Sequence, residues 1–292
     1  MSIPRLTDYP LPQGSDLPAN KVAWQPVPQR AALLIHDMQD YFLQFWAPDS
    51  ALIRQVVNNI ARLRDACHQA GIPVFYTAQP ENQCAEDRAL LNDMWGPGIT
   101  RYPAQQCITA RLAPASQDTV LTKWRYSAFA RSDLESRLTA AGRDQLFICG
   151  VYAHIGCLTT ATDAFMRDIQ AFMVADGLAD FSEEEHRMAL RYTAGRSGCV
   201  LDTQQILDAL RTETDWTLAR LKTLLLPALD EDIDDIDADE NLLDYGLDSV
   251  RIMSLASHWR QQGHALDFIA LVKQPTLNGW LKLLTLPTRE HV

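Results

Sequence analysis

The sequence predicts a three-layer α/β/α sandwich with a mainly parallel sheet, followed by a small four-helix bundle. Up to about residue 205, short apolar runs alternate with amphipathic stretches, as expected when helices cover both faces of a parallel sheet. Beyond that point the alternation stops, and helical patterns continue without a convincing strand. We therefore expect a first domain over residues 1–207, a linker over 208–214 and a second domain over 215–292.

Six apolar runs are the expected strands of the first domain. They are AALLIHDM, PVFYTAQ, TVLTKW, QLFICGVY, AFMVADGLAD and GCVLDT, which begin at residues 31, 73, 119, 145, 171 and 198. Between the first two, Leu52, Val56, Ile60 and Leu63 recur at helical spacing and Gly71 ends the helix, which completes a strand–helix–strand unit. Ligands of such sheets bind at the carboxyl ends of strands, so catalytic residues are expected just after the strands.

Further amphipathic patterns predict the remaining helices. In the first domain they are SDLESRLTAAG, CLTTATDAFMRDI and SEEEHRMALRYTAG, which begin at residues 132, 157 and 182. In the second domain they are DWTLARLKTLLLPALD, VRIMSLASHWRQQG and TLNGWLKLL, which begin at residues 215, 250 and 276. Their apolar residues recur every three or four positions, so each helix buries one face.

Composition and charge narrow the classes of function. The net charge is −11, and ten acidic residues but no basic one lie between Asp230 and Asp248, which argues against nucleic acid as a partner. Proline interrupts the N-terminal segment and no apolar run reaches the length of a membrane span, so we expect a cytoplasmic protein that does not enter a membrane. The six cysteines are not closely paired, which predicts neither a disulfide framework nor a zinc site. The acidic segment 230–240 is either a solvated surface or a docking surface.

A serine begins the second helical pattern of the C-terminal domain, in NLLDYGLDSVRIMSL. Asp248 is a suitable N-cap, Ser249 is then the first helical residue, and Gly246 allows a tight turn before them. The plain interpretation is a capped helix, but free N–H groups and the helix dipole also favour a phosphodiester there. DYGLDSV resembles the phosphopantetheine attachment motif of acyl and peptidyl carrier proteins. This resemblance implies covalent 4′-phosphopantetheine on Ser249, whose thiol carries an acyl group as a thioester.

Polar residues follow three of the expected strands. They are Asp37 in LLIHDMQDYF, Lys123 in VLTKWRYSAF, and the turn from His154 to Cys157 in VYAHIGCLTT. A salt bridge alone would account for the first two. With the turn included, the pattern resembles the isochorismatase-like (cysteine hydrolase) superfamily over about residues 20–205. The amidase members of that superfamily use an aspartate, a lysine and a cysteine as a catalytic triad.

The cysteine of this turn is displaced by one residue from the superfamily's nucleophile. Thr160 and Ala161 match the small residues that follow the nucleophile by four and five positions, and counting back from them reaches Gly156. One residue at a helix start turns a side chain by about 100°, so Cys157 is expected to point away from the pocket as a buried structural thiol. Gly156 is expected to leave space and backbone donors for a substrate where the amidases keep their sulfur.

Glycine at this position, together with LLIHDMQDYF, YTAQP, DRALLNDMWGPG, KWRYSAF and GVYAHIGC, is similar to the true isochorismatases. The fused carrier domain is similar to the bifunctional isochorismatase and aryl carrier proteins of enterobactin-type catechol siderophore pathways. The resemblance implies hydrolysis of the enolpyruvyl ether of isochorismate to 2,3-dihydro-2,3-dihydroxybenzoate and pyruvate. A vinyl ether offers no acyl carbon to a thiolate, and its hydrolysis starts when an acid protonates the methylene carbon. The site therefore needs a general acid.

Asp37 is the strand-end carboxyl that matches the catalytic acid of the superfamily, so we expect it to supply the proton. Burial would raise the pKa of this carboxyl and Lys123 would lower it, and the sequence leaves the balance open. Lys123 either holds the carboxyl in place or binds the departing pyruvyl carboxylate. Gly156 completes the catalytic group.

The resemblance also implies a set of substrate-binding residues. Gln79 and Arg88 would contact the enolpyruvyl carboxylate, although Arg88 could equally be a surface arginine on a helix. The other implied residues are Tyr152 beside the backbone of the glycine turn, and Phe42, Trp95 and Tyr126 as apolar walls. His36 and His154 are interpreted as hydrogen-bonded structural histidines. The metal triad of nicotinamidase-like relatives needs an Asp-x-His pair followed by another histidine, and the sequence contains no such pair, so no metal is expected.

The implied partners follow from this pathway. They are isochorismate, a phosphopantetheinyl transferase, an adenylating ligase that loads 2,3-dihydroxybenzoate, and a downstream condensation enzyme of a nonribosomal peptide synthetase. Val250 and Met253 beside the modified serine, and Phe268 in the following loop, either contact these enzymes or pack in the core. Superfamily relatives imply a homo-oligomer, most simply a dimer through the α/β domain.

Two other functions stay open at this point. One is an amidase that uses Cys157 and is fused to a carrier domain, which inactivation by alkylation of Cys157 would support. The other is a non-catalytic scaffold joined to a carrier domain, against which the presence of both Asp37 and Lys123 argues.

Overall fold

A computed structural model describes residues 3–211, 217–225, 229, 236–261 and 268–285. The chain divides into two compact units, Met1–Leu210 and Arg211–Val292, which are described separately. The expected boundary at residue 207 falls within helix α8 (Thr203–Arg211), because Leu207 and Leu210 of this helix are buried in the core of the first unit. Several expected features lie outside the described residues: linker residues 212–214, the ends of the helix expected over 215–230, and acidic residues 230–235.

One sheet of six parallel strands organises the first unit, with strand order β3-β2-β1-β4-β5-β6. The strands are β1 (Ala31–His36), β2 (Val74–Ala78), β3 (Thr119–Thr122), β4 (Gln145–Val151), β5 (Gln170–Ala179) and β6 (Gly198–Leu201). Five of them lie within the apolar runs that predicted them, and β5 begins one residue before its run. The chain builds outward from β1 to β3 and then returns to place β4 on the other side of β1. A ligand crevice is expected where the order reverses, at the carboxyl ends of β1 and β4.

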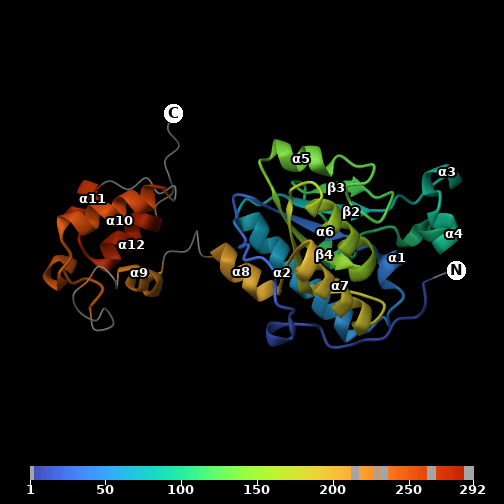
Figure 1. The fold of residues 1–292 in the computed structure, drawn as a ribbon, viewed down its shortest axis with the longest axis horizontal. Helices are drawn as coiled ribbons and strands as arrows, with labels where there is room; N and C mark the ends of the chain where they lie inside the picture. Colours follow the sequence, from blue (N-terminus) through green and yellow to red (C-terminus); the bar gives the residue numbers. More distant parts are fainter. Residues whose placement is uncertain (1–2, 212–216, 226–228, 230–235, 262–267, 286–292) are drawn as a thin grey trace. The chain divides into compact units, whose positions relative to one another are not determined.

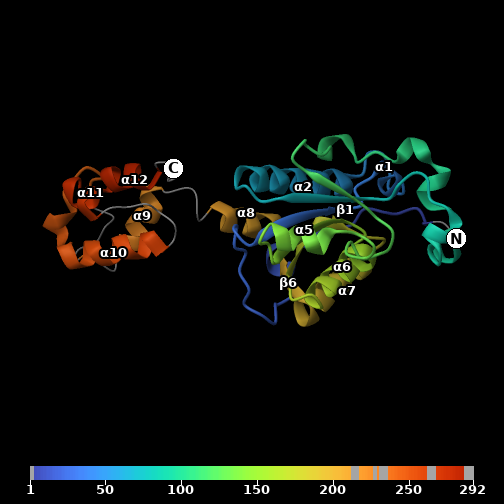
Figure 2. The ribbon, with the colours of Figure 1, turned by 90° about the horizontal axis from the view of Figure 1, so that it is seen from above.

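Helices cover both faces of the sheet, as Figures 1 and 2 show. The long helices are α2 (Ala51–Gln69) on one face, and α5 (Leu134–Ala140), α6 (Leu158–Phe165) and α7 (Glu183–Arg196) on the other. Along β1, Leu33 and Ile35 face α2, whereas Ala32 and Leu34 face α6. A strand buried on both faces needs apolar residues at every position, which is why the strands appear in the sequence as continuous apolar runs.

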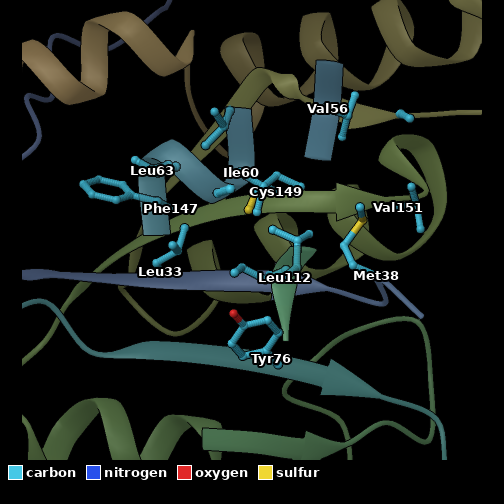
Figure 3. Close-up of a cluster of buried hydrophobic side chains, with 14 of the residues drawn as sticks. Leu33, Met38, Val56, Ile60, Leu63, Tyr76, Leu112, Phe147, Cys149 and Val151 are labelled. Carbon is cyan, nitrogen blue, oxygen red and sulfur yellow. The ribbon is translucent and has the colours of Figure 1, made fainter. Parts of the chain in front are cut away.

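The core beneath α2 contains the helix residues that the periodicity singled out. Val56, Ile60 and Leu63 are fully buried and lie over Phe147 and Cys149 of β4 (Figure 3). The helix begins where the Ser50 hydroxyl accepts a hydrogen bond from the backbone N–H of Ile53 at 3.1 Å. Gly71 follows its end with φ +65, the left-handed conformation that glycine adopts at little cost.

The remaining elements of the first unit are short. They are η1 (Gly14–Asp16), α1 (Asp40–Leu43), α3 (Ala85–Arg88), α4 (Leu91–Trp95), η2 (Gly98–Arg101), η3 (Pro103–Gln105), η4 (Ala110–Leu112) and η5 (Ala153–Cys157), the last a π-helical turn. No described helix of the chain has the length and apolar character needed to cross a membrane.

The described part of the second unit contains four α-helices and one 3₁₀ turn. They are α9 (Leu218–Leu225), η8 (Leu242–Tyr245), α10 (Ser249–Gln261), α11 (Phe268–Lys273) and α12 (Leu277–Thr285). Their apolar faces meet around Trp259 and Trp280, two fully buried rings in edge-to-face contact at 5.8 Å. The Trp280 indole N–H donates to the Leu271 carbonyl oxygen at 2.9 Å, which satisfies the polar atom of this ring inside the core.

Candidate active site

The carboxylate of Asp37 lies at the carboxyl end of β1, where the chain turns with φ +50. One of its oxygens accepts a hydrogen bond from the Thr77 hydroxyl at 2.5 Å, and the other accepts one from the Lys123 ammonium at 2.9 Å. Thr77 belongs to β2, and Lys123 follows β3 directly. The pairing of β1 with β2 and of β2 with β3 therefore brings these three side chains to one edge of the sheet. Positive φ is a sparsely populated conformation for a residue other than glycine, and such conformations are enriched at active sites.

Burial and the neighbouring positive charge shift the pKa of the Asp37 carboxyl in opposite directions. The residue is 5 % exposed and Lys123 is 3 % exposed. Burial raises the pKa of the Asp37 carboxyl, but Lys123, His36 and Thr77 together outweigh it and hold that pKa below its ordinary value. The balance that the sequence left open therefore favours an ionised carboxylate, paired with an ammonium group, in the absence of ligand.

A cavity opens over this ion pair at the carboxyl edge of β1 and β4, with about 560 Å³ of empty space including its mouth. All nine residues selected from the sequence line it: Asp37, Phe42, Gln79, Arg88, Trp95, Lys123, Tyr126, Tyr152 and Gly156. Sequence reasoning did not place eight others there: Ile3, His36, Tyr41, Leu91, Arg125, Val151, Ile155 and Phe181. The cavity lies where the strand order reverses, as the topology predicts.

Arg88 is a buried cation in this cavity, so its interpretation as a surface arginine is wrong. It is 4 % exposed, and its guanidinium donates to the Gly96 carbonyl oxygen at 2.6 Å and to the Gln79 side-chain oxygen at 3.3 Å. Gly98 packs directly against it, since a Cβ there would lie 2.4 Å from a guanidinium nitrogen. Within the described ranges no carboxylate forms an ion pair with Arg88. A buried guanidinium without a counter-anion is suited to bind an anionic ligand.

Arg125 adds a second guanidinium that sequence reasoning missed. It lines the same cavity and donates to the backbone carbonyl oxygens of Asp87 at 2.8 Å and Trp124 at 2.6 Å. A signal for it was present, because residues two apart in an extended segment point to the same side and Arg125 stands two positions after Lys123.

Aromatic side chains form the walls of the cavity, and the hydroxyl groups of Tyr126 and Tyr152 differ in their hydrogen bonds. The Trp95 indole N–H donates to the Tyr126 hydroxyl oxygen at 2.7 Å, which leaves the hydroxyl proton of Tyr126 for another acceptor. The Tyr152 hydroxyl instead donates its proton to the Phe42 carbonyl oxygen at 2.7 Å. Tyr152 therefore contributes mainly its ring, which lies 4.7 Å from that of Phe181 in edge-to-face contact.

The turn after β4 places Gly156 at the cavity, but the expected space above it is absent. A Cβ at Gly156 would lie 2.2 Å from Cε1 of His36, so the imidazole of His36 already occupies this volume. The prediction that the glycine leaves space for substrate is therefore wrong. Cys157 is fully buried in the core beneath α6 and does not line the cavity, as the one-residue displacement predicts. Burial raises the pKa of the Cys157 thiol well above its ordinary value, which makes it a poor nucleophile.

The two histidines of the site region are both held by hydrogen-bond partners. Nδ1 of His36 lies 2.9 Å from the Val151 carbonyl oxygen, and burial followed by the charge of Lys123 lowers the pKa of His36 to about 4. Nδ1 of His154 lies 2.5 Å from Asp180, outside the cavity lining.

The side chains of His154, Asp180 and Glu185 have possible metal-ligand atoms within 4.8 Å of one another. The Asp180 carboxylate, however, already accepts the backbone N–H groups of residues 154 and 181.

Ser249 lies exposed at the start of α10 in the second unit, as predicted. The Asp248 carboxylate caps this helix by accepting the Arg251 N–H at 2.7 Å, and Gly246 adopts φ +90 in the preceding turn. Val250 and Met253 are 76 % and 55 % exposed, so they do not belong to the core of the bundle. Phe268, expected in a loop, instead begins α11 and packs partly buried against that core.

Comparison with known proteins identifies both units. Residues 31–205 match the isochorismatase domain, and residues 219–284 match the phosphopantetheine attachment site. The chain belongs to the isochorismatase family. The isochorismatase domain is thus an enzyme, and it is followed by a carrier domain that takes phosphopantetheine as its covalent cofactor.

Relatives of this isochorismatase cover nearly the whole chain. Enterobactin synthase component B of Escherichia coli K12 is 59 % identical over 285 residues, which are 98 % of this chain and 99 % of the relative. The isochorismatase of Bacillus subtilis is 47 % identical over 299 residues, or 98 % and 96 % of the two chains. A cysteine hydrolase from Pseudomonas syringae pv. phaseolicola superposes with a TM-score of 0.61 at 23 % identity, covering 67 % of this chain and 98 % of that one. This last likeness concerns the fold alone.

Because Asp37 and Lys123 form a buried ion pair, we expect removal of one partner to destabilise the isochorismatase domain much more than removal of both. Asp37→Ala leaves the Lys123 ammonium buried without a partner and should lower the free energy of unfolding at pH 7 by about 3–5 kcal/mol. Asp37→Ala combined with Lys123→Met removes the stranded charge and should recover most of that loss. Because the pKa of Asp37 is held low, the contribution of the pair is present above about pH 4 and is lost as the pH falls through that lowered pKa.

Urea denaturation of the wild type and these variants measures the effect. Asp40→Ala is the matched control, because Asp40 is an exposed carboxylate three residues away and should change stability little. A double variant no more stable than Asp37→Ala would contradict the role assigned to the pair.

Proposed function

We propose that the isochorismatase domain hydrolyses the enolpyruvyl ether of isochorismate to 2,3-dihydro-2,3-dihydroxybenzoate and pyruvate, with Asp37 delivering the proton. The observation that carries this proposal is the buried Asp37–Lys123 pair at the base of a cavity whose described lining contains no cysteine, serine or threonine. Such a site offers acid–base chemistry and no thiol or aliphatic hydroxyl nucleophile, which matches a vinyl ether and not an amide. The isochorismatase of Bacillus subtilis, which covers nearly the whole chain, supports the same substrate by its name.

The reaction divides into protonation and hydration. The carboxyl O–H bond of Asp37 breaks as its proton forms a C–H bond with the terminal methylene carbon, which gives an oxocarbenium ion. Water adds to the cationic carbon and returns a proton to the carboxylate, which restores the acid. The resulting hemiketal then breaks the bond between its central carbon and the ether oxygen. The proton of its new hydroxyl passes to that oxygen, so pyruvate leaves and the ring keeps a hydroxyl group. The carboxylate is ionised in the free site, but two negative charges on a bound substrate raise its pKa and favour uptake of the proton it must deliver.

The charges of the cavity match those of the substrate. Arg88, Lys123 and Arg125 are three cations against the single carboxylate of Asp37, a net charge of +2 with His36 neutral at pH 7. Isochorismate carries two carboxylates. We assign the enolpyruvyl carboxylate to Arg88 with Gln79 and the ring carboxylate to Arg125. Paired guanidinium–carboxylate contacts in a closed cavity orient the ether toward Asp37.

The carrier domain, which we place over residues 215–292, holds 4′-phosphopantetheine on Ser249. The Ser249 hydroxyl is exposed at the first turn of a helix of 13 residues, where free backbone N–H groups face a phosphodiester. When attached, the group supplies a thiol that carries 2,3-dihydroxybenzoate as a thioester. The exposed side chains of Val250 and Met253 offer apolar contacts beside it to the transferase, the adenylating ligase and the condensation enzyme.

Two further features complete the proposal. The six cysteines are all free thiols, which supports a reducing cytoplasmic location. The dimer implied by superfamily resemblance stays a prediction.

Replacing the proton donor should abolish most turnover without preventing binding. Asp37→Asn keeps the shape of the side chain and removes the transferable proton, so kcat should fall roughly 100- to 10,000-fold while KM changes little. Pyruvate release from isochorismate measures both constants, with Asp40→Asn as the control. Unchanged turnover in Asp37→Asn would show that another group delivers the proton.

Removing a cavity guanidinium should instead weaken substrate binding. Arg88→Gln and Arg125→Gln each remove charge-assisted hydrogen bonds worth about 1.5–3 kcal/mol, so KM should rise roughly 10- to 150-fold. Arg101→Gln, at an exposed arginine of η2, is the control for loss of charge alone. If KM for isochorismate were the same in Arg88→Gln as in the wild type, the carboxylate assignment would fail.

Loading of the carrier domain should depend on one hydroxyl. After treatment with coenzyme A and a phosphopantetheinyl transferase, the intact mass of the wild type should rise by one phosphopantetheinyl group, whereas that of Ser249→Ala should not change. Ser254→Ala, at an exposed serine of the same helix, should be modified like the wild type. Modification of Ser249→Ala would overturn the assignment. Pyruvate release should be equal in all three proteins because the ether cleavage uses residues of the first unit only.

A further inference from the structure

His36 and Gly156 interlock at the place where the strand order reverses. His36 ends β1, and Gly156 lies in the π-helical turn after β4. A Cβ built on Gly156 would lie 2.2 Å from Cε1, 2.8 Å from Nε2 and 3.2 Å from Nδ1 of the imidazole. Real side chains do not approach so closely, so any residue larger than glycine at position 156 requires the His36 ring to move.

Hydrogen bonds and close packing hold the ring in this position. His36 is fully buried, with Nδ1 2.9 Å from the Val151 carbonyl oxygen and Nε2 3.3 Å from the Tyr126 carbonyl oxygen. The backbone beside it is equally close-packed, because a Cβ at Gly150 of β4 would lie 2.1 Å from the carbonyl oxygen of His36. Two glycines of this segment thus allow β4 and its following turn to close onto one histidine.

The volume held by the imidazole lies next to the catalytic ion pair. Nδ1 of His36 is 3.6 Å from the Asp37 carboxylate, and both histidine and glycine line the cavity. A thiol or hydroxyl that grew from position 156 would enter beside the carboxylate and the Lys123 ammonium. These are the groups that activate a side chain as a nucleophile, either by accepting its proton or by stabilising its anion.

We infer that His36 determines the reaction class of this site, because its imidazole occupies the position that a nucleophilic side chain at residue 156 would need. With that position filled, the Asp37–Lys123 pair faces the substrate directly and acts on it only through proton transfer. This inference rests on the proposed function for its meaning in catalysis. The interlock itself is a property of the unliganded protein and can be tested without isochorismate.

Thermal unfolding of the full chain tests the interlock. Gly156→Ala adds only the clashing Cβ and should lower the Tm of the isochorismatase domain by about 2–10 °C, or prevent folding. Gly156→Ala in a His36→Val background should have a higher Tm than Gly156→Ala alone, because the shorter side chain vacates the space. Gly195→Ala is the matched control: a Cβ there meets nothing within 4 Å, so its Tm should be unchanged or raised.

Thiol reactivity tests the chemical consequence. The exposed Cys84 and Cys107 are first replaced by serine, which leaves four buried native thiols. Gly156→Cys combined with His36→Val should then be alkylated by iodoacetamide at residue 156, because the vacated space gives its thiol access to the cavity. The rate at residue 156 should be roughly tenfold or more above that of Gly156→Cys with His36 intact.

Clear outcomes would overturn the inference. A Gly156→Ala protein as stable as the wild type would mean that the ring yields, and a double variant with Tm no higher than Gly156→Ala, or equally unfolded, would mean that His36 is not the obstacle. Equal alkylation of Gly156→Cys with and without His36 would refute the exclusion of a nucleophile. Failure of the wild type to release pyruvate from isochorismate would instead refute the proposed function and leave these results intact.

Discussion

The buried ion pair between Asp37 and Lys123 is the interaction on which the rest of the site depends. It joins the carboxyl ends of β1 and β3 across β2, whose Thr77 hydroxyl satisfies the other carboxylate oxygen. Two charges buried this deeply are tolerated only when each compensates the other, so the ends of the three strands must keep their register. The same pair places an acid–base group beside an aromatic-walled cavity, where electrostatic interactions are stronger than in bulk water.

The sequence was sufficient for the sheet and for the residues at its carboxyl edge. Strands buried on both faces leave continuous apolar runs, and polar residues directly after such runs, such as Asp37 and Lys123, stand out against them. The short elements between residues 85 and 112 were not predicted, because helices of three to five residues have no periodicity and are held by contacts such as those of Arg88.

The sequence did not show which side chain packs against the turn after β4. Gly156 was recognised as an absent side chain, but its neighbour His36 lies 120 positions earlier in an apolar strand, where nothing reveals which way the imidazole points. Similarly, the sequence left Arg88 open between a substrate-binding residue and a surface arginine, because its local sequence is polar. Only tertiary packing against Gly98 shows that it is buried. Each of these contacts joins two residues that are separated in the sequence, so the sequence around one of them does not reveal the other.

The guanidinium of Arg88, which forms no ion pair with the carboxylates of the described residues, links ligand binding to folding stability. This guanidinium is a desolvated positive charge whose hydrogen bonds go to neutral oxygens, which carries an electrostatic cost that a fitting carboxylate would relieve. Since the side chain is already fixed by Gly98 and its acceptors, a ligand loses little free energy in ordering it. The isochorismatase domain should therefore act as its own sensor of carboxylates, with thermal stability rising as substrate, product or a small mimic fills the cavity.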